Sequence, residues 1–253
     1  MATAAVLIAG LLAALFFLPR LALAAVVAVV LALGAFEWAH LCRLGSGAAR
    51  LYAAVAVGLF VATVFAPFDR AVFVAAAAFW LLVAVPWLWI GVAPAHAYGL
   101  AIAGLLALVP AGLAMIELRP LEVLAVIALT SLADTAAYFV GRAWGRHKLA
   151  PSISPGKSWE GAFAGLVAGL AYAIICAALL GVNSWTPWLG AAALLVVMSI
   201  VGDLFESAAK RQAAVKDSGS LLPGHGGVFD RIDSATATLP LAALLLPLLE
   251  RVR

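Results

Sequence analysis

Charged residues are scarce in this sequence. Asp, Glu, Lys and Arg make up 11% of its 253 residues, whereas soluble domains carry about a quarter. Hydrophobic residues make up 66%, and the mean hydropathy is +1.15. Apolar runs of about 20 residues, the length that crosses a bilayer as a helix, recur almost end to end. The composition excludes a soluble globular protein and predicts an integral membrane protein.

Cysteine and histidine are also rare. The two cysteines, Cys42 and Cys176, are far apart and form neither a disulfide framework nor a metal pair. The four histidines include no HExxH motif and no cysteine at ligand spacing, so a zinc site is not indicated. A GxxxxGK[ST] sequence is missing too, which argues against a P-loop nucleotide site.

The period-two alternation of membrane β-strands is absent, which favours an all-α transmembrane bundle. Residues 4–18 could form a signal-peptide core, but no basic residue precedes them and a second apolar run follows at once, so we expect a span. Apolar runs and their polar breaks predict about nine helices, at 2–18, 21–41, 50–66, 71–91, 96–117, 120–141, 160–180, 186–209 and 234–250.

One domain, residues 1–253, is expected, with 1–130 mostly scaffold and 131–253 catalytic, because neither a repeat nor a linker is visible. Two connections are long, 142–159 and 210–233. Two spans separate them, so both should emerge on the same face. Lys and Arg counted on alternate sides favour that face by ten to five, and the positive-inside rule makes it cytoplasmic, together with the N-terminus. The C-terminus would lie opposite.

More than half of the charged residues lie in 134–160 and 203–233. Asp203, Glu206, Ser207 and Lys210 follow the i, i+3, i+4, i+7 spacing and therefore line one face of a helix. An ionisable group at membrane depth normally faces a cavity or a partner. Functional groups are one interpretation; an ion pair from Lys210 to Asp203 or Glu206 that only braces helices is the other.

A second helix carries Thr130, Asp134 and Tyr138 at i, i+4 and i+8, ahead of Gly141 and Arg142. Hydrogen-bonded packing explains a lone buried Asp near a Tyr hydroxyl equally well.

The connection after Asp203 interleaves acids and bases with glycines. Converging carboxylates repel one another, and a hard divalent cation such as Mg²⁺, which takes carboxylates together with substrate phosphates, relieves that repulsion. Arg and Lys would then hold phosphate oxygens. His225 has three possible roles. We rank a hydrogen bond donated to phosphate first and a turn residue second; a general base is the third. The polar residues of this segment are Arg211, Lys216, Asp217, His225, Asp230, Arg231 and Asp233.

Residues 151–161, PSISPGKSWEG, place Ser154, Lys157 and Ser158 ahead of a helix that begins near Trp159 and Glu160. A helix N-terminus attracts anions, so this loop is compatible with phosphate. Taken alone, Ser-Pro-Gly is more typical of an ordinary turn and cap.

These residues match a family. SAAKRQAAVKDSGSLLPGHGGVFDRIDS, residues 207–234, resembles the signature of the membrane phosphatidate cytidylyltransferases, which make CDP-diacylglycerol from CTP and phosphatidic acid. DTAAYFVGRAWGRHKLAPSISPGKSWEG, residues 134–161, is similar to the family's other polar segment, and the Phe36-Glu37-Trp38 stretch also fits. Gly156 stands where members often carry a second Lys. This loop therefore has one cation fewer with which to bind phosphate.

The resemblance implies roles for individual residues. Asp203 and Asp230 would be the first Mg²⁺ ligands, with Asp233 and Asp217 as further carboxylates. Lys210, Arg211, Lys216 and Arg231 would hold phosphates, while Ser207 and His225 would donate hydrogen bonds. The substrate-binding residues would be Asp134, Tyr138, Arg142, Ser154, Lys157, Glu160, Gly226 and Gly227.

The expected partners are CTP, phosphatidic acid and the lipid bilayer, and no nucleic acid. The expected cofactor is Mg²⁺ or Mn²⁺; an assisting monovalent cation and a homodimer stay open. A cytidylyltransferase or kinase acting on another membrane lipid is the nearest alternative. An ion-coupled transporter would also place carboxylates in a membrane, but its site should lie between repeated halves, and here the charges cluster near helix ends.

Overall fold

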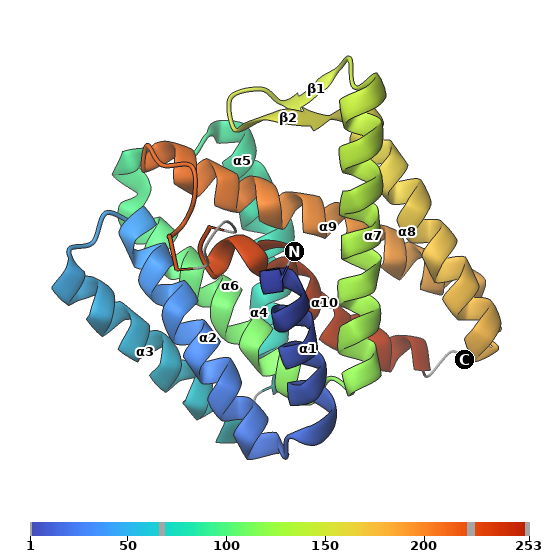
Figure 1. The fold of residues 1–253 in the computed structure, drawn as a ribbon, viewed down its shortest axis with the longest axis horizontal. Coiled ribbons are helices and arrows are strands. Elements are labelled where there is room, and N and C mark those ends of the chain that lie inside the picture. Colours follow the sequence, from blue (N-terminus) through green and yellow to red (C-terminus); the bar gives the residue numbers. More distant parts are fainter. Residues whose placement is uncertain (1, 66–68, 222–225, 251–253) are drawn as a thin grey trace.

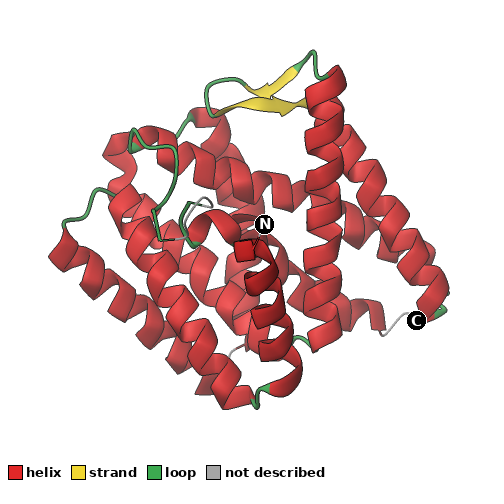
Figure 2. Cartoon of the chain, in the orientation of Figure 1, coloured by secondary structure: helices red, strands yellow, loops and turns green. Residues whose placement is uncertain are grey.

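The computed structural model describes residues 2–65, 69–221 and 226–250. Nine helices and one short hairpin make up these residues (Figures 1 and 2). The helices are α1 (Ala2–Phe17), α2 (Arg20–Leu41), α3 (Ser46–Phe65), a continuous helix made of α4 (Asp69–Ala78), the π-helical η1 (Phe79–Ala84) and α5 (Val85–Ile90), then α6 (Ala97–Glu117), α7 (Pro120–Trp144), α8 (Trp159–Leu180), α9 (Trp185–Gln212) and α10 (Asp233–Glu250). Two 3₁₀ turns, η2 (Pro94–His96) and η3 (Phe229–Arg231), precede α6 and α10.

Seven of these helices are long and apolar enough to cross a membrane: α2, α3, the continuous helix from Asp69 to Ile90, α6 extended to begin at Pro94, α7, α8 and α9. The apolar part of α1, Ala5–Phe17, is shorter, and α10 has 18 residues. Each predicted helix has a counterpart within a few residues. The prediction of a polytopic all-α membrane bundle is therefore confirmed.

The connection after α7 contains regular structure that the sequence did not predict. Strands β1 (Lys148–Ala150) and β2 (Ser154–Ser158) pair antiparallel, with Lys148 opposite Ser158 and Ala150 opposite Ser154. Strands of three and five residues are too short to show alternation. The hairpin lies at the same end of the bundle as the C-terminal end of α9 (Figure 1), and Arg211 Nε donates to the carbonyl of Ile153 at 3.1 Å. The described parts of the two long connections therefore lie on the same face, as predicted.

Glycines let α7 and α8 approach closely. A Cβ at Gly161 would lie 2.6 Å from the carbonyl oxygen of Ala137, and one at Gly165 would lie 2.8 Å from that of Ala133. Small residues at such positions are the usual device for close helix packing in membranes. The contact fixes Asp134, one residue after Ala133, relative to the hairpin that leads into α8.

An aromatic cluster supports α9 from the side of the scaffold. Phe205 packs between Trp38 of α2, Phe79 and Trp80 of η1, and Trp87 of α5, with ring centroids 5.6–6.2 Å apart. Phe205 is 1% exposed. Aromatic packing of this kind stabilises a core beyond the area it buries. The cluster therefore fixes the turn of α9 that carries the acidic side chains Asp203 and Glu206.

Gly104 on α6 provides the space that Trp38 occupies. The Trp38 indole N–H donates to the carbonyl of Leu100 at 2.7 Å, and a Cβ at Gly104 would lie 2.2 Å from Trp38 Cδ1. Because the ring is buried, it cannot move away without disrupting the cluster.

We predict that Gly104→Ala destabilises the protein by about 1–3 kcal/mol, the usual range for overpacking. Thermal unfolding in detergent measures this. Gly58→Ala on α3 is the matched control, because nothing lies within 4 Å of the added Cβ. Equal melting temperatures for the two variants would contradict this account of the packing.

Candidate active site

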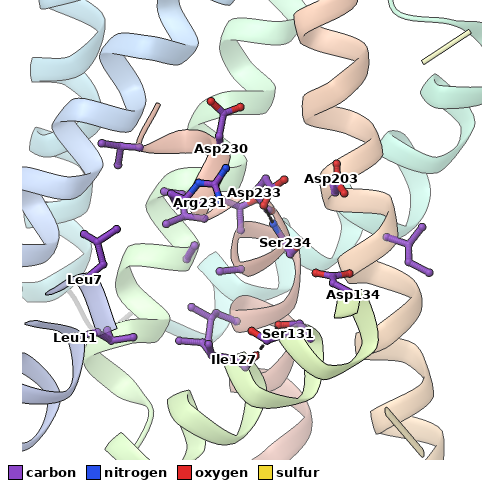
Figure 3. Close-up of a pocket in the computed structure, with 18 of the residues that line it drawn as sticks. Leu7, Leu11, Ile127, Ser131, Asp134, Asp203, Asp230, Arg231, Asp233 and Ser234 are labelled. Atoms are coloured by element: carbon purple, nitrogen blue, oxygen red, sulfur yellow. Dashed lines mark hydrogen bonds between the residues drawn. The ribbon is translucent and has the colours of Figure 1, made fainter. Parts of the chain in front are cut away.

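A cavity of about 1520 Å³ opens between α1, α2, α6, α7, the hairpin, α9 and the start of α10. Figure 3 shows its two kinds of wall: acids and Arg231 gather on one side, while Leu7 and Leu11 of α1 lie on another. The apolar wall continues along α2 and α6 with Val27, Leu31 and Leu108. A charged site therefore shares one cavity with an apolar surface.

Three carboxylates converge at the charged side. Asp203 and Glu206 lie on α9 and Asp233 begins α10, and one oxygen of each lies within 4.8 Å of the others. Glu206 is only 1% exposed, and its Oε1 has no hydrogen-bond partner within the described chain. A buried oxygen without a partner costs free energy, so this atom is a candidate ligand position.

Two lysines neutralise part of this negative charge. Lys157 Nζ, at the end of the hairpin, lies 2.6 Å from Asp203 Oδ2. Lys210 Nζ lies 2.7 Å from both Glu206 Oε2 and Asp230 Oδ1. Three of the four carboxylates near this site thus form ion pairs with the two ammonium groups, and Asp233 is the fourth. If all are ionised, two negative charges remain, which the charge of one divalent cation would balance.

Asp230, on η3, is held by hydrogen bonds from the protein. Its Oδ2 accepts from the Ser218 amide at 3.0 Å and the Gly227 amide at 2.8 Å, and it lies 3.1 Å from the Ser218 hydroxyl oxygen. Burial raises the pKa of the Asp230 carboxyl, but its interaction with the neighbouring Glu206 carboxyl and the hydrogen bonds from Lys210 and these amides outweigh burial and lower the pKa to about 2. Asp230 is therefore ionised at neutral pH.

Gly226 makes this arrangement possible. Its φ is +77°, and a Cβ there would lie 2.6 Å from Asp230 Oδ2. Both the backbone conformation and the close approach require glycine.

The carboxylate grouping differs from the set that the resemblance implied. Asp203 and Asp233 are together as expected, and Glu206 joins them. Asp230 lies beside the group, across Lys210, and both of its oxygens accept hydrogen bonds from the protein. A direct bond from Asp230 to a metal stays a prediction.

Other predicted residues lie beside the carboxylates or in the cavity wall. Ser207 Oγ donates to Asp203 Oδ1 at 3.3 Å, and Arg142 donates to the Tyr138 hydroxyl at 2.9 Å. The cavity wall includes Asp134, Tyr138, Arg142, Ser154, Lys157 and Arg231.

Several predicted residues with described positions lie outside the cavity wall. Glu160 accepts hydrogen bonds from the backbone and ring of His147, at 3.2 and 2.6 Å, and therefore fixes the hairpin. Arg211 donates to backbone carbonyls, while Lys216 and Asp217 are exposed. His225 lies outside the described residues. The roles predicted for Lys216 and Asp217 stay predictions.

Two important carboxylates were missed or given a lesser role. The sequence places Glu206 on one helix face with Asp203, but the resemblance assigns it no role at the site. Glu37 was noticed only as part of a resemblance. The signal that could have found it is a lone acid in an apolar helix, which needs a specific partner.

The fold and the site define a polytopic membrane protein with a carboxylate and lysine centre at the edge of an apolar cavity. The sequence matches the profile of the Cytidylyltransferase family over residues 1–249. The chain therefore belongs to this family.

Curated relatives carry one name. The phosphatidate cytidylyltransferase of Pseudomonas aeruginosa is 43% identical, over 96% of this chain and 94% of that protein. Those of Haemophilus influenzae and Brucella suis are 49% and 52% identical; the alignments cover 46% and 44% of this chain, and 42% and 40% of those proteins.

We predict that Lys210→Met destabilises the protein by about 3–5 kcal/mol, because Glu206 and Asp230 would lose their shared counter-ion while remaining buried. Chemical or thermal unfolding in detergent measures the change. Lys216→Met, at an exposed position, should change stability by less than about 0.5 kcal/mol. Equal stability of the two variants would show that Lys210 does not neutralise the buried acids.

Proposed function

We propose that this chain transfers the CMP group of CTP to phosphatidate, giving CDP-diacylglycerol and pyrophosphate. A phosphate oxygen of phosphatidate forms a bond to the α-phosphorus of CTP, and the bond from that phosphorus to the bridging oxygen of the β-phosphate breaks. Pyrophosphate leaves with the electron pair. The observation that carries the proposal is a single cavity that joins a phosphate-compatible charged site to an apolar wall.

A divalent cation, Mg²⁺ or Mn²⁺, fits the residues present. The unpartnered Glu206 Oε1 and the excess of carboxylates over lysines both favour one. Asp203, Glu206 and Asp233 would hold it through oxygen ligands, which these ions prefer. When bound, the ion neutralises phosphate charge near the reacting phosphorus.

The chain's own cations would orient the two anionic substrates. Lys157, Arg142 and Arg231 line the cavity and can turn toward phosphate oxygens. Arg binds phosphate as a bidentate fork and Lys as a point charge. Because the attacking phosphate is already an anion, no side chain has to remove a proton. Positioning and charge neutralisation would therefore supply most of the catalysis.

The apolar wall favours a lipid acceptor over a soluble one. Leucines and valines of α1 and α2 face the same cavity as Arg231 and Asp233. Acyl chains would lie along this wall, while the phosphate of the same molecule reaches the cations. CTP would enter from the end of the bundle that carries the hairpin.

We place that end at the cytoplasmic face. Basic residues concentrate in the hairpin and at the C-terminal end of α9, as the positive-inside rule requires. A homodimer stays a prediction.

The purified protein in detergent, given CTP labelled at the α-phosphate together with phosphatidate, should produce a labelled lipid that co-migrates with CDP-diacylglycerol. Parallel reactions with diacylglycerol or an isoprenyl phosphate, and with ATP or GTP, test the choice of substrate. Label transfer to another acceptor in preference to phosphatidate would contradict the proposed function.

Asp203→Asn and Asp233→Asn should each lower kcat by about 10²–10³-fold, the range for losing one charge-stabilising group in an active site. EDTA should abolish wild-type activity, and Mg²⁺ should restore it. Asp69→Asn, at the start of α4, is the matched control and should remain active. Full activity of either site variant, or activity in EDTA, would overturn the metal assignment.

A further inference from the structure

Glu37 is a buried carboxylate in the part of the chain that otherwise serves as scaffold. It lies on α2 and is 7% exposed. Within the described residues it forms no ion pair. A buried anion is tolerated only when hydrogen bonds replace its water, so the identity of its donors shows what Glu37 holds in place.

Within the described chain, the donors to Glu37 belong to the connection between α9 and α10. Glu37 Oε1 accepts from the Val228 amide at 3.0 Å, and Oε2 accepts from the Phe229 amide at 2.9 Å. The Ser218 hydroxyl donates to Oε2 at 3.0 Å. The carboxylate therefore joins two parts of the connection that are ten residues apart.

Two glycines pack directly on this carboxylate. A Cβ at Gly219 would lie 2.3 Å from Glu37 Oε1, and one at Gly227 would lie 2.5 Å from Oε2. The neighbouring Trp38 packs its ring on Phe229, with centroids 4.7 Å apart. Successive residues of α2 thus hold both the backbone and the side chain at the start of η3.

The same contacts lead to the active site. Ser218, which donates to Glu37, also binds Asp230 Oδ2 through its amide and lies 3.1 Å from it through its hydroxyl. Asp230 accepts from Lys210, and Lys210 binds Glu206. A continuous series of hydrogen bonds therefore runs from Glu37 to the carboxylate group, and Glu37 itself is not part of the cavity wall.

We infer that Glu37 is a positioning residue for the reaction: its carboxylate fixes Ser218 and the backbone at 228–229, and so sets the location of Asp230 and Lys210. This inference rests on the proposed function. Glu37 touches no substrate in this scheme. Its effect should therefore appear in kcat, with little change in substrate binding.

Glu37→Gln is the sharpest test because it keeps the shape of the side chain but replaces one accepting oxygen with a donating NH₂. That group would face a backbone N–H, so at least one of the three hydrogen bonds is lost. We expect kcat to fall about 10- to 100-fold, the effect of losing a hydrogen bond to a charged group. The KM values for CTP and phosphatidate should stay within about threefold of wild type.

Two further variants keep the test decisive if Glu37→Gln folds poorly. Ser218→Ala leaves both amide contacts to Glu37 and removes only the bridging hydroxyl, so kcat should fall about 3- to 10-fold. In the double variant the two effects should not add, since both act through one contact. Glu117→Gln, which pairs with Arg20, is the matched control and should have wild-type kcat.

Amide hydrogen exchange of residues 226–232 provides a readout that does not depend on activity. Exchange should accelerate in Glu37→Gln and stay unchanged in Glu117→Gln. If the wild type is active and Glu37→Gln keeps full kcat, the positioning role of Glu37 is overturned while the proposed function stands. Additive effects in the double variant would overturn it too. Unchanged exchange would show that Glu37 does not hold the backbone at 228–229.

A wild type that labels no lipid would instead refute the proposed function. The exchange result would still decide whether Glu37 holds this backbone.

Discussion

The central physical constraint in this protein is the neutralisation of carboxylates inside an apolar bundle. Asp203, Glu206 and Asp233 come together with Asp230 beside them, and Lys157 and Lys210 form ion pairs with three of these four acids. An uncompensated charge in such surroundings is costly. A divalent ion and anionic substrates held by nearby cations would complete the balance. Bound ligands would therefore complete the charge balance of the site, and the surrounding helices keep the acids from separating.

The scaffold supplies this rigidity from two directions. The aromatic cluster around Phe205 holds the turn of α9 between Asp203 and Glu206. Glu37 on α2 holds the start of η3 through backbone amides. The apolar side of the cavity is made by α1, α2 and α6. The first half of the chain thus contributes to the site, although few of its residues are charged.

Much of this could be predicted from the sequence. Apolar run length predicts the helices because a bilayer sets their length, and helical spacing places Asp203 and Glu206 on one face. Which carboxylates meet could not be predicted, since that depends on how η3 and α10 dock against α9. Asp230 lies in a connection without helical spacing, so the sequence could not show that it would stand beside the group rather than in it. The partners of Glu37 lie more than 180 residues away along the chain, so local patterns carried no information about them.

The central claim is that Asp203, Glu206 and Asp233 form one divalent-ion site in this cavity. Anomalous scattering from crystals grown with Mn²⁺ tests it most directly. The account predicts an anomalous peak bounded by these three carboxylates, absent when Asp203 is replaced by Asn. A peak at another site in catalytically active protein, or none between these residues, would contradict it.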